Sequence, residues 1–216
     1  MAADKYSMGV DIGSTASKCL ILKNGEETVG KSIIAAGTGT SGPGRAVAEA
    51  LAQAGLSMED ISCVTATGYG RNTFSAADYI VSELSAHAIG AYALFPGVRT
   101  VIDIGGQDAK VIRVNEQGKM ENFIMNDKCA AGTGRFLDVM ARVLELDVSE
   151  LEKRDAMAET TVRISSTCTV FAESEVISQL AQNVDINALV AGIHDSVAVR
   201  TASLVRRLGL LEPDVM

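Results

Sequence analysis

The sequence predicts an α/β fold made of two related domains, and a repeated tripeptide is the main reason. Asp-Ile-Gly ends a short apolar stretch twice, at Asp11–Gly13 and again at Asp103–Gly105. Each copy is followed by small or polar residues and then by a second apolar stretch, a pattern that indicates strand, glycine turn and strand. Helix-forming segments follow both hairpins. The plan of hairpin, strand and helix therefore occurs twice, as a distant repeat of architecture rather than of sequence.

The composition is that of an ordinary folded protein. With 216 residues and 47% hydrophobic content, the chain can bury a substantial core in one or two domains. A net charge of −8 without a run of Lys or Arg argues against nucleic acid as a partner. No apolar run approaches the length that spans a bilayer, and the polar residues 1–6 do not resemble a signal peptide. We therefore expect a cytoplasmic protein with no membrane partner.

The first domain is expected to cover residues 1–98. A loop rich in glycine leads to a helix with Pro43 near its first turn, and Gly55 stops that helix. Apolar runs bounded by turn residues predict the strands, and an Ala-rich run predicts a long second helix. The expected strands are 7–11, 18–22, 27–36 and 61–67, and the expected helices are about 43–54 and 75–94.

The second domain is expected to cover residues 99–216 and to restart the same scheme. Three strands alternate with glycine or polar turns, and amphipathic helices follow them. The charged stretch 147–160 is expected to be solvated helix and loop, and residues 213–216 resemble the opening of a further strand. The expected strands are 100–104, 109–114 and 120–125, and the expected helices are about 132–146, 170–182 and 185–208.

The two hairpins are candidates for a phosphate site. An Asp at a strand end often only caps a turn, but Asp11 and Asp103 form a matched pair beside glycine turns whose N–H groups can approach a phosphate. Phosphoryl transfer needs such N–H groups, a Mg²⁺ ion and an oriented water more than it needs a nucleophile. We expect Asp11 and Asp103 to hold Mg²⁺ through water and Gln107 to orient the attacking water. Lys18 is equally compatible with a solvated position. The expected cofactor-binding positions are Gly13, Ser14, Thr15, Lys18, Gly105, Gly106, Gln107, Gly132 and Gly134.

Cysteine is the other residue type that points to chemistry. Disulfides are not expected in a cytoplasmic protein, so the cysteines are thiols or ligands. Cys129 precedes Ala-Ala-Gly-Thr-Gly and an amphipathic helix, and Cys168 lies between two threonines at another helix start. A helix N-terminus lowers a thiol pKa and favours anions, although cysteines at this spacing are usually buried thiols. Cys19 and Cys63 lie within strands and are expected to be core thiols.

The sequence leaves the roles of four further charged residues open. Arg71 and Arg135 follow glycine turns, and a phosphate contact, a partner contact and a solvated position are all compatible with them. Glu173 and Glu175 follow Cys168 in the same motif. Both glutamates are compatible with orienting helices at an interface.

Five segments together resemble one protein family. They are Val10–Lys18, Ala66–Arg71, Val101–Ile112, Asn126–Leu137 and Ser165–Glu175. The family is that of the activators of 2-hydroxyacyl-CoA dehydratases, within the BadF/BadG/BcrA/BcrD ATPases, and the last two segments are its specific motifs. The resemblance implies an actin-like ATPase fold, of the ribonuclease H-like kind, with two domains around an ATP·Mg²⁺ cleft.

The resemblance also implies a cofactor and an electron-transfer activity. A [4Fe–4S] cluster is expected on the axis of a homodimer, held by two cysteines from each subunit at the positions of Cys129 and Cys168. Turnover of ATP to ADP is expected to drive a low-potential electron from the cluster to a separate 2-hydroxyacyl-CoA dehydratase. A ferredoxin or flavodoxin is expected to supply that electron. Such proteins are oxygen-sensitive and serve anaerobic amino-acid fermentation.

The resemblance leaves some questions open. Family members continue beyond the position of Met216 with a strand-turn that packs on the adenosine and a helix that returns to the first domain. The C-terminal part of the fold is therefore expected to be missing from this chain. Two other interpretations are a small-molecule kinase of the same superfamily and a non-catalytic cluster-binding fragment. The sequence does not identify the acyl-CoA on which the partner dehydratase acts.

Overall fold

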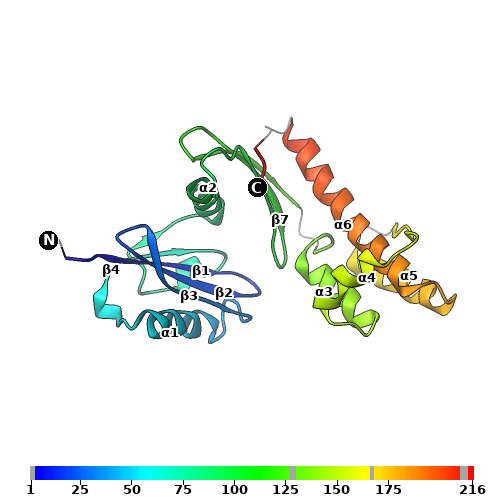
Figure 1. Cartoon of the computed structure of the whole chain (residues 1–216), viewed down its shortest axis with the longest axis horizontal. Coiled ribbons are helices and arrows are strands. Elements are labelled where there is room, and N and C mark those ends of the chain that lie inside the picture. Colours follow the sequence, from blue (N-terminus) through cyan, green and yellow to red (C-terminus); the bar gives the residue numbers. More distant parts are fainter. Residues whose placement is uncertain (1–2, 127–129, 166–167, 210–213) are drawn as a thin grey trace. The chain divides into compact units, whose positions relative to one another are not determined.

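The computed structural model describes residues 3–126, 130–165, 168–209 and 214–216 (Figure 1). It divides into two compact units, residues 1–90 and 91–216, and each unit is described by itself. A five-stranded sheet belongs to the first unit and a three-stranded sheet to the second. Each sheet contains one of the two Asp-Ile-Gly hairpins.

The first unit is built on a mixed sheet with the strand order β3-β2-β1-β4-β5. Its strands are β1 (Tyr6–Ile12), β2 (Ser17–Lys23), β3 (Glu27–Ile34), β4 (Ile61–Thr67) and β5 (Tyr79–Ile80). The first three form an antiparallel meander, β4 is parallel to β1, and β5 is parallel to β4. The first four strands confirm the ranges expected from the sequence to within two residues.

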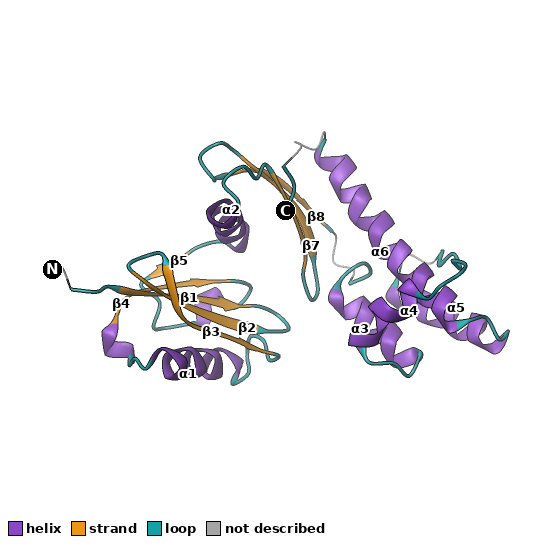
Figure 2. Cartoon of the chain, viewed as in Figure 1, coloured by secondary structure: helices purple, strands orange, loops and turns teal. Residues whose placement is uncertain are grey.

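One face of this sheet is apolar because apolar and polar residues alternate along its strands. Helix α1 (Gly42–Ala54) covers that face (Figure 2). Pro43 lies in the first turn of α1, and Gly55 ends it in the left-handed conformation, with φ of 66°. The helix therefore begins and ends at the predicted residues. The buried core between helix and sheet consists of Met8, Val10, Ile12, Cys19, Ile21, Ile34, Ala46, Val47, Ala50 and Val64.

The helix expected at 75–94 is wrong in its first half. Residues Tyr79–Ile80 form β5 instead, and α2 covers only Glu83–Leu94. The Asp78 N–H donates to the carbonyl of Val64 at 2.9 Å, and the Asp78 carboxylate accepts from the Val64 N–H at 2.8 Å. These two bonds hold the segment at the edge of the sheet. Long-range pairing with β4 thus overrides the helix propensity of the Ala-rich run.

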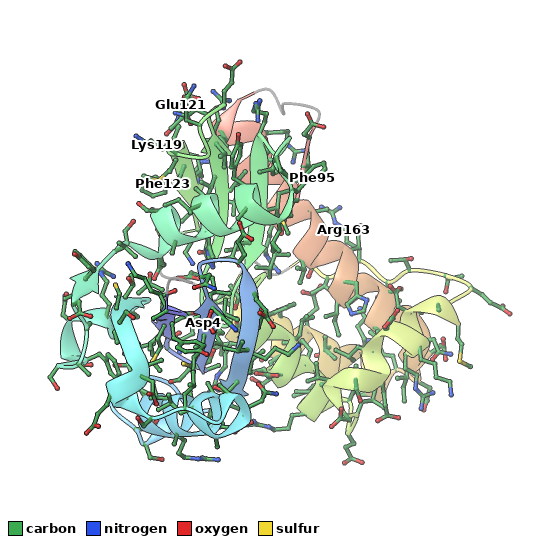
Figure 3. The ribbon with its side chains drawn as sticks, turned by 60° about the vertical axis from the view of Figure 1, so that its left-hand side comes forward. Asp4, Phe95, Lys119, Glu121, Phe123 and Arg163 are labelled. Carbon is green, nitrogen blue, oxygen red and sulfur yellow. The ribbon has the colours of Figure 1, made fainter. Side chains whose placement is uncertain are left out.

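The second unit combines an antiparallel sheet, in the order β6-β7-β8, with a group of helices. Its strands are β6 (Thr100–Ile104), β7 (Ala109–Val114) and β8 (Met120–Met125), and its α-helices are α3 (Gly134–Val143), α4 (Leu151–Ala156), α5 (Thr169–Ala181) and α6 (Ile186–Leu208). β8 is the outer strand of the sheet and exposes Glu121 and Phe123 (Figure 3). All three strands confirm the expected ranges.

The helices of the second unit share one apolar core. Phe136 of α3, Val176 of α5 and Ile193 of α6 are fully buried in it. Leu151, at the start of α4, is only 2% exposed and belongs to the same core. The expectation of solvated helix and loop at 147–160 is therefore confirmed except at Leu151, the one apolar residue that anchors α4 among its charged neighbours.

Helix α6 links the helical core to the sheet. Leu189 near its start packs among the helices, and Leu204 near its end packs with Val111 of β7. Among the described residues, α6 alone is long and apolar enough to cross a membrane, which the sequence does not lead us to expect. Half of its apolar stretch is buried inside the protein, and burial of that kind is typical of a core helix.

Residues 214–216 lie along β6 and pair with it through an isolated bridge, so the strand expected there stays a prediction. The Met216 N–H donates to the carbonyl of Thr100 at 2.9 Å, and the Ile102 N–H donates to the carbonyl of Met216 at 2.8 Å. A parallel bridge joins Thr100 and Val215. Pro213 lies outside the described residues.

Candidate phosphate hairpins and cysteine motifs

Both hairpins, hairpin 1 of β1 and β2 and hairpin 2 of β6 and β7, place an aspartate and a lysine directly opposite each other. Asp11 of β1 pairs in register with Lys18 of β2, and Asp103 of β6 pairs in register with Lys110 of β7. The Lys18 amine lies 2.7 Å from an Asp11 carboxylate oxygen, and the Lys110 amine lies 3.3 Å from an Asp103 oxygen. The two hairpins therefore repeat one structural unit, Asp-Ile-Gly followed by lysine seven residues after the aspartate.

The turns of the two hairpins are also alike. The Gly13 N–H donates to the carbonyl of Ala16 at 3.0 Å, and the Gly105 N–H donates to the carbonyl of Asp108 at 2.8 Å. A β-carbon at Gly13 would come within 2.8 Å of the Ala16 oxygen, and one at Gly105 within 3.0 Å of the Asp108 oxygen. Only glycine avoids this collision, so both glycines are required by the shape of the turn.

The tips of the two turns carry the predicted phosphate-binding residues. In the described part of the chain, the tip N–H groups of Ser14, Thr15, Gly106 and Gln107 donate no hydrogen bond. Gln107 is exposed at its tip. Free N–H groups beside a carboxylate and an amine are the features that bind a phosphate with its Mg²⁺ ion.

Two loops contact the backbone of hairpin 1: the loop after β4, with Gly68 and Gly70, and the loop after β3, with Thr38. The Gly70 N–H donates to the carbonyl of Ile12 at 2.8 Å, and the Thr38 N–H donates to that of Gly13 at 2.9 Å. Gly68 has φ of 85°, and a β-carbon there would lie 2.3 Å from an Asp11 carboxylate oxygen. The glycines of the Ala66–Arg71 motif therefore allow the close approach that fixes Asp11.

The arginine of that motif stabilises its own turn. The Arg71 guanidinium donates to the carbonyl of Gly68 at 2.9 Å. The sequence left a phosphate contact, a partner contact and a solvated position open for Arg71. The structure shows a different contact, to a carbonyl of the loop that supports hairpin 1. Its partner is a backbone carbonyl two residues before the Gly70 that holds hairpin 1.

Lys110 belongs to hairpin 2 beside Asp103 and was not predicted from the sequence. Its side chain is only 5% exposed, and its amine lies 2.8 Å from Asp108 as well as 3.3 Å from Asp103. Lys18 is 47% exposed and contacts one carboxylate, Asp11. The signal that could have found Lys110 is its spacing from Asp103, which equals that of Lys18 from Asp11.

Replacing Lys110 by methionine is expected to destabilise the second unit, because two neighbouring carboxylates lose the amine between them. We expect Lys110→Met to lower the free energy of unfolding by about 2–3 kcal/mol, less than for a fully buried pair since both carboxylates are partly exposed. Lys18→Met, which removes a half-exposed partner, is expected to cost less than about 1 kcal/mol. Urea titration of both variants measures the difference. Equal losses would contradict this assignment.

The glycine-rich run before α3 contacts hairpin 2. The Gly134 N–H donates to the carbonyl of Gly105 at 2.9 Å, and the Arg135 N–H donates to that of Gly106 at 2.9 Å. Gly132 has φ of 87°, and a β-carbon there would lie 3.1 Å from the Arg200 side chain. Gly134 and Arg135 thus reach the hairpin through its carbonyls, on the side away from the free N–H groups. Direct nucleotide binding by Gly132 and Gly134 stays a prediction.

The structure describes one of the two cysteines expected to bind a cluster. Cys168 is a half-buried free thiol at the N-cap of α5, and its side chain makes no capping hydrogen bond. The next hydroxyl, that of Thr169, is buried and has no hydrogen-bond partner among the described residues. Cys129 lies outside the described residues. Within those residues, no group of three or more His, Cys, Asp or Glu side chains could hold a metal ion.

Glu175 binds Ser165, three residues before Cys168 in the sequence. Its carboxylate accepts hydrogen bonds from the Ser165 N–H at 3.0 and 3.1 Å and from the Ser165 hydroxyl at 2.9 Å. Glu175 lies on α5, two turns after Cys168 at its N-cap. The carboxylate therefore bonds Ser165 to α5, a contact that the sequence left open. Nothing in the described contacts gives Glu173 a comparable role.

The remaining cysteines are unlike Cys168. Cys19 is only 3% exposed in the core of the first unit, and burial raises the pKa of its thiol to about 11. A thiol with that pKa stays protonated near neutral pH and is a poor metal ligand. Cys63 is a half-buried free thiol in β4. The expectation of a core thiol is confirmed for Cys19 and is wrong for Cys63, which is only half-buried at its place in β4.

The first unit also contains a cavity of about 610 Å³. Asp11 and Lys18 border it, and apolar residues such as Leu20 and Ile33 line much of the rest. Leu20 is 41% exposed and Ile33 is 76% exposed, although both are large apolar side chains. The carboxylate and amine of hairpin 1 are therefore reachable from an open hollow in the same unit.

Comparison with known proteins identifies close relatives. The model of the BadF/BadG/BcrA/BcrD ATPase family matches residues 8–216. The chain is 57% identical to the 2-hydroxyisocaproyl-CoA dehydratase activator of Clostridioides difficile, over 98% of this chain and 79% of that protein. It is 58% identical to the (R)-2-hydroxyglutaryl-CoA dehydratase activating ATPase of Acidaminococcus fermentans, over 98% and 81%. It is 56% identical to the activator of lactoyl-CoA dehydratase of Anaerotignum propionicum, over 98% and 81%.

Solved structures agree with these matches. The crystal structure of component A of the A. fermentans (R)-2-hydroxyglutaryl-CoA dehydratase has a TM-score of 0.93 and 58% identity, covering 98% of this chain and 81% of that chain. The activator of the 2-hydroxyisocaproyl-CoA dehydratase from Clostridium difficile, solved with bound ADPNP, has a TM-score of 0.93 and 57% identity, covering 97% and 78%. The fold is the actin-like ATPase fold, as expected from the sequence.

Proposed function

Because the chain belongs to the BadF/BadG/BcrA/BcrD ATPase family, we propose that it is an ATP-hydrolysing activator of a 2-hydroxyacyl-CoA dehydratase. We further propose that it delivers a low-potential electron to that partner. The observation that carries the proposal is the matched pair of Asp–Lys hairpins, on a chain that is 56% to 58% identical to three activators.

The hairpins would supply what ATP hydrolysis requires. The proposal assigns two domains, 1–98 and 99–216, to one nucleotide, with a hairpin from each. The free N–H groups at the tips would bind phosphate oxygens, and Asp11 and Asp103 would hold Mg²⁺ through water. Lys18 would add positive charge, and the exposed Gln107 would orient the attacking water. Hydrolysis then depends on positioned donors and a metal ion rather than on a protein nucleophile.

The residues around Cys168 fit a [4Fe–4S] cluster that Cys129 and Cys168 of two subunits would hold. Cys168 lies at the N-terminus of a 13-residue helix, where the helix dipole favours an anionic thiolate and cluster. The buried hydroxyl of Thr169, which has no partner among the described residues, would be available to a sulfur acceptor. When bound, the cluster supplies a one-electron carrier. Glu175 would keep the segment before Cys168 in place.

The free energy needed to make an electron strongly reducing is a reason to combine an ATPase and a cluster in one protein. For a one-electron couple, about 59 mV corresponds to about 1.4 kcal/mol. Making an electron several hundred millivolts more reducing therefore needs many kcal/mol, which a few hydrogen bonds to the sulfurs do not provide. ATP binding and hydrolysis would provide it. In this proposal a ferredoxin or flavodoxin donates the electron, and the protein works as a cytoplasmic homodimer.

The acyl-CoA is a property of the partner enzyme. Relatives of nearly equal identity are activators of dehydratases for 2-hydroxyisocaproyl-CoA, (R)-2-hydroxyglutaryl-CoA and lactoyl-CoA. Overall identity therefore does not select one of these substrates. The proposal names the class, a 2-hydroxyacyl-CoA, and leaves the choice within it to the dehydratase.

Reconstitution with a dehydratase tests the proposal. Anaerobically purified protein is mixed with a 2-hydroxyacyl-CoA dehydratase, a chemical reductant and ATP·Mg²⁺, and loss of the 2-hydroxyacyl-CoA is followed. We expect turnover with ATP and none with a non-hydrolysable analogue, because hydrolysis drives the electron transfer. The protein is expected to be brown and to bleach in air. A colourless protein that phosphorylates a sugar or an acid would instead identify a small-molecule kinase.

A further inference from the structure

The N-terminus of α3 is attached to hairpin 2 through two peptide groups. Gly134 and Arg135, in the first turn of α3, donate their N–H groups to the carbonyls of Gly105 and Gly106. First-turn N–H groups have no partner within their own helix, so these two bonds satisfy donors that would otherwise need water or a cap. The helix therefore begins on the hairpin itself.

The same two peptide groups reach the tip of the hairpin on their other side. A peptide unit joins the Gly105 carbonyl to the Gly106 N–H, and the next joins the Gly106 carbonyl to the Gln107 N–H. In a planar trans peptide, the carbonyl and the N–H point in opposite directions. The N–H groups of Gly106 and Gln107 thus point away from α3. A phosphate bound to these N–H groups would polarise the bonds to α3, because hydrogen bonds in a chain strengthen one another.

Thr133 adds a side-chain bond to this connection. Its hydroxyl lies 3.1 Å from the carbonyl of Gly106 and 2.5 Å from that of Ala130, and the residue is fully buried. Thr133 is the N-cap of α3, where a threonine hydroxyl ordinarily accepts a bond from the helix N–H groups. Here it makes no such cap bond. The single hydroxyl proton is instead shared between two carbonyls that lie behind the helix, that of Gly106 in the hairpin and that of Ala130, the residue just after Cys129.

Asn126, three residues before Cys129 in the sequence, is also bonded to hairpin 2. The Asn126 N–H donates to the carbonyl of Ala109 at 3.0 Å, and the Asn126 amide oxygen accepts from the Ala109 N–H at 2.9 Å. Ala109 is the first residue of β7 and directly follows the turn. Residues 126 and 133, three positions before and four after Cys129 in the sequence, are therefore both bonded to hairpin 2.

We propose that Thr133 is a positioning residue that transmits the nucleotide state of hairpin 2 to the cysteine segment. Binding of phosphate at the N–H groups of Gly106 and Gln107 would shift the Gly106 carbonyl, and the Thr133 hydroxyl would carry that shift to Ala130. The inference rests on the proposed function, because it assigns phosphate to the hairpin and iron to Cys129. It names the contact through which ATP would act on the cluster within one subunit.

Two variants at one position isolate the hydroxyl. Thr133→Val keeps the shape and removes the hydroxyl, and Thr133→Ser keeps the hydroxyl. Hydrogen–deuterium exchange of a peptide covering residues 130–137 is compared between the ADP state and the state with a non-hydrolysable ATP analogue. We expect a nucleotide-dependent difference in the unmodified protein and in Thr133→Ser, and little or none in Thr133→Val. Nucleotide affinity is expected to change by no more than roughly 10-fold, the effect of one neutral hydrogen bond.

Iron release provides a second measurement. The rate at which a chelator removes iron from the anaerobic protein is expected to differ between the two nucleotide states, and Thr133→Val should abolish that difference. The proposal is overturned if Thr133→Val keeps the full difference. It is also overturned if the unmodified protein binds both nucleotides without any change in exchange, a result that does not depend on whether the valine variant folds. Failure to bind nucleotide or iron at all would overturn the proposed function instead.

Discussion

Anaerobically purified Cys168→Ser protein is expected to lose its iron and its colour while it keeps its affinity for nucleotide. Serine does not supply the thiolate that an iron–sulfur cluster requires, and a dimer-bridging cluster would lose one ligand from each subunit. The substitution itself is mild, because Cys168 is half-buried and its side chain makes no capping bond. Iron and sulfide content, visible absorption and nucleotide titration together measure the result.

Cys63→Ser is the matched control for that experiment. Cys63 is also a half-buried free thiol, but it lies in β4 of the first unit. The control is expected to keep its iron and its colour. Cys129→Ser should behave as Cys168→Ser does, since both residues are assigned to one cluster. Iron retained in Cys168→Ser, or lost in Cys63→Ser, would show that the cluster assignment is wrong.

The hairpins could be predicted from the sequence because their determinants are local. Gly13 and Gly105 are required by oxygens only three residues away, and Pro43 and Gly55 act at the ends of their own helix. Contacts at such short range leave a signature in the sequence itself. The same reasoning predicted Cys168 at a helix start, since α5 begins at the next residue.

The departures, one helix and the single residue Leu151, concern contacts between residues that are distant in the sequence. Asp78 turns an Ala-rich run into an edge strand by bonding to Val64, and Leu151 joins a core formed by other helices. Local composition favours a helix in the first case and a solvated stretch in the second, and neither signal contains the tertiary partner. Only the folded structure supplies these partners.

Two residues of the proposed site, Lys110 and Thr133, differ in how far the sequence could have predicted them. Lys110 has the same spacing from its aspartate as Lys18, so the sequence contained its signal, but only the register of the strands shows that the two lysines are equivalent. Thr133 has no such signal, because its hydroxyl makes a bond that a helix-capping threonine does not ordinarily make. The repeated unit was therefore predictable in principle, and the connection to α3 was not.

Asp11→Asn is expected to reduce ATP hydrolysis by roughly 100-fold or more, because an amide binds a Mg²⁺-bound water less well than a carboxylate does. The fold should change little. The Asp11–Lys18 pair is exposed by 29% and 47% at its two side chains, and such pairs contribute at most about 1 kcal/mol. Steady-state ATPase assays and thermal unfolding separate the two effects. Asp103→Asn is expected to show a similar loss of hydrolysis.

Asp4→Asn is the control that separates a catalytic charge from an ordinary one. Asp4, labelled in Figure 3, forms an ion pair with Lys23 at 2.9 Å in the same unit. A hydrogen bond from Lys23, with a second from Asn24, lowers the pKa of the Asp4 carboxyl below its usual value. Asp4→Asn therefore removes one charge and one ion pair but should leave hydrolysis unchanged. If both asparagine variants lost activity equally, net charge rather than metal binding at hairpin 1 would explain the loss. If neither did, the hairpin would not be the site of hydrolysis.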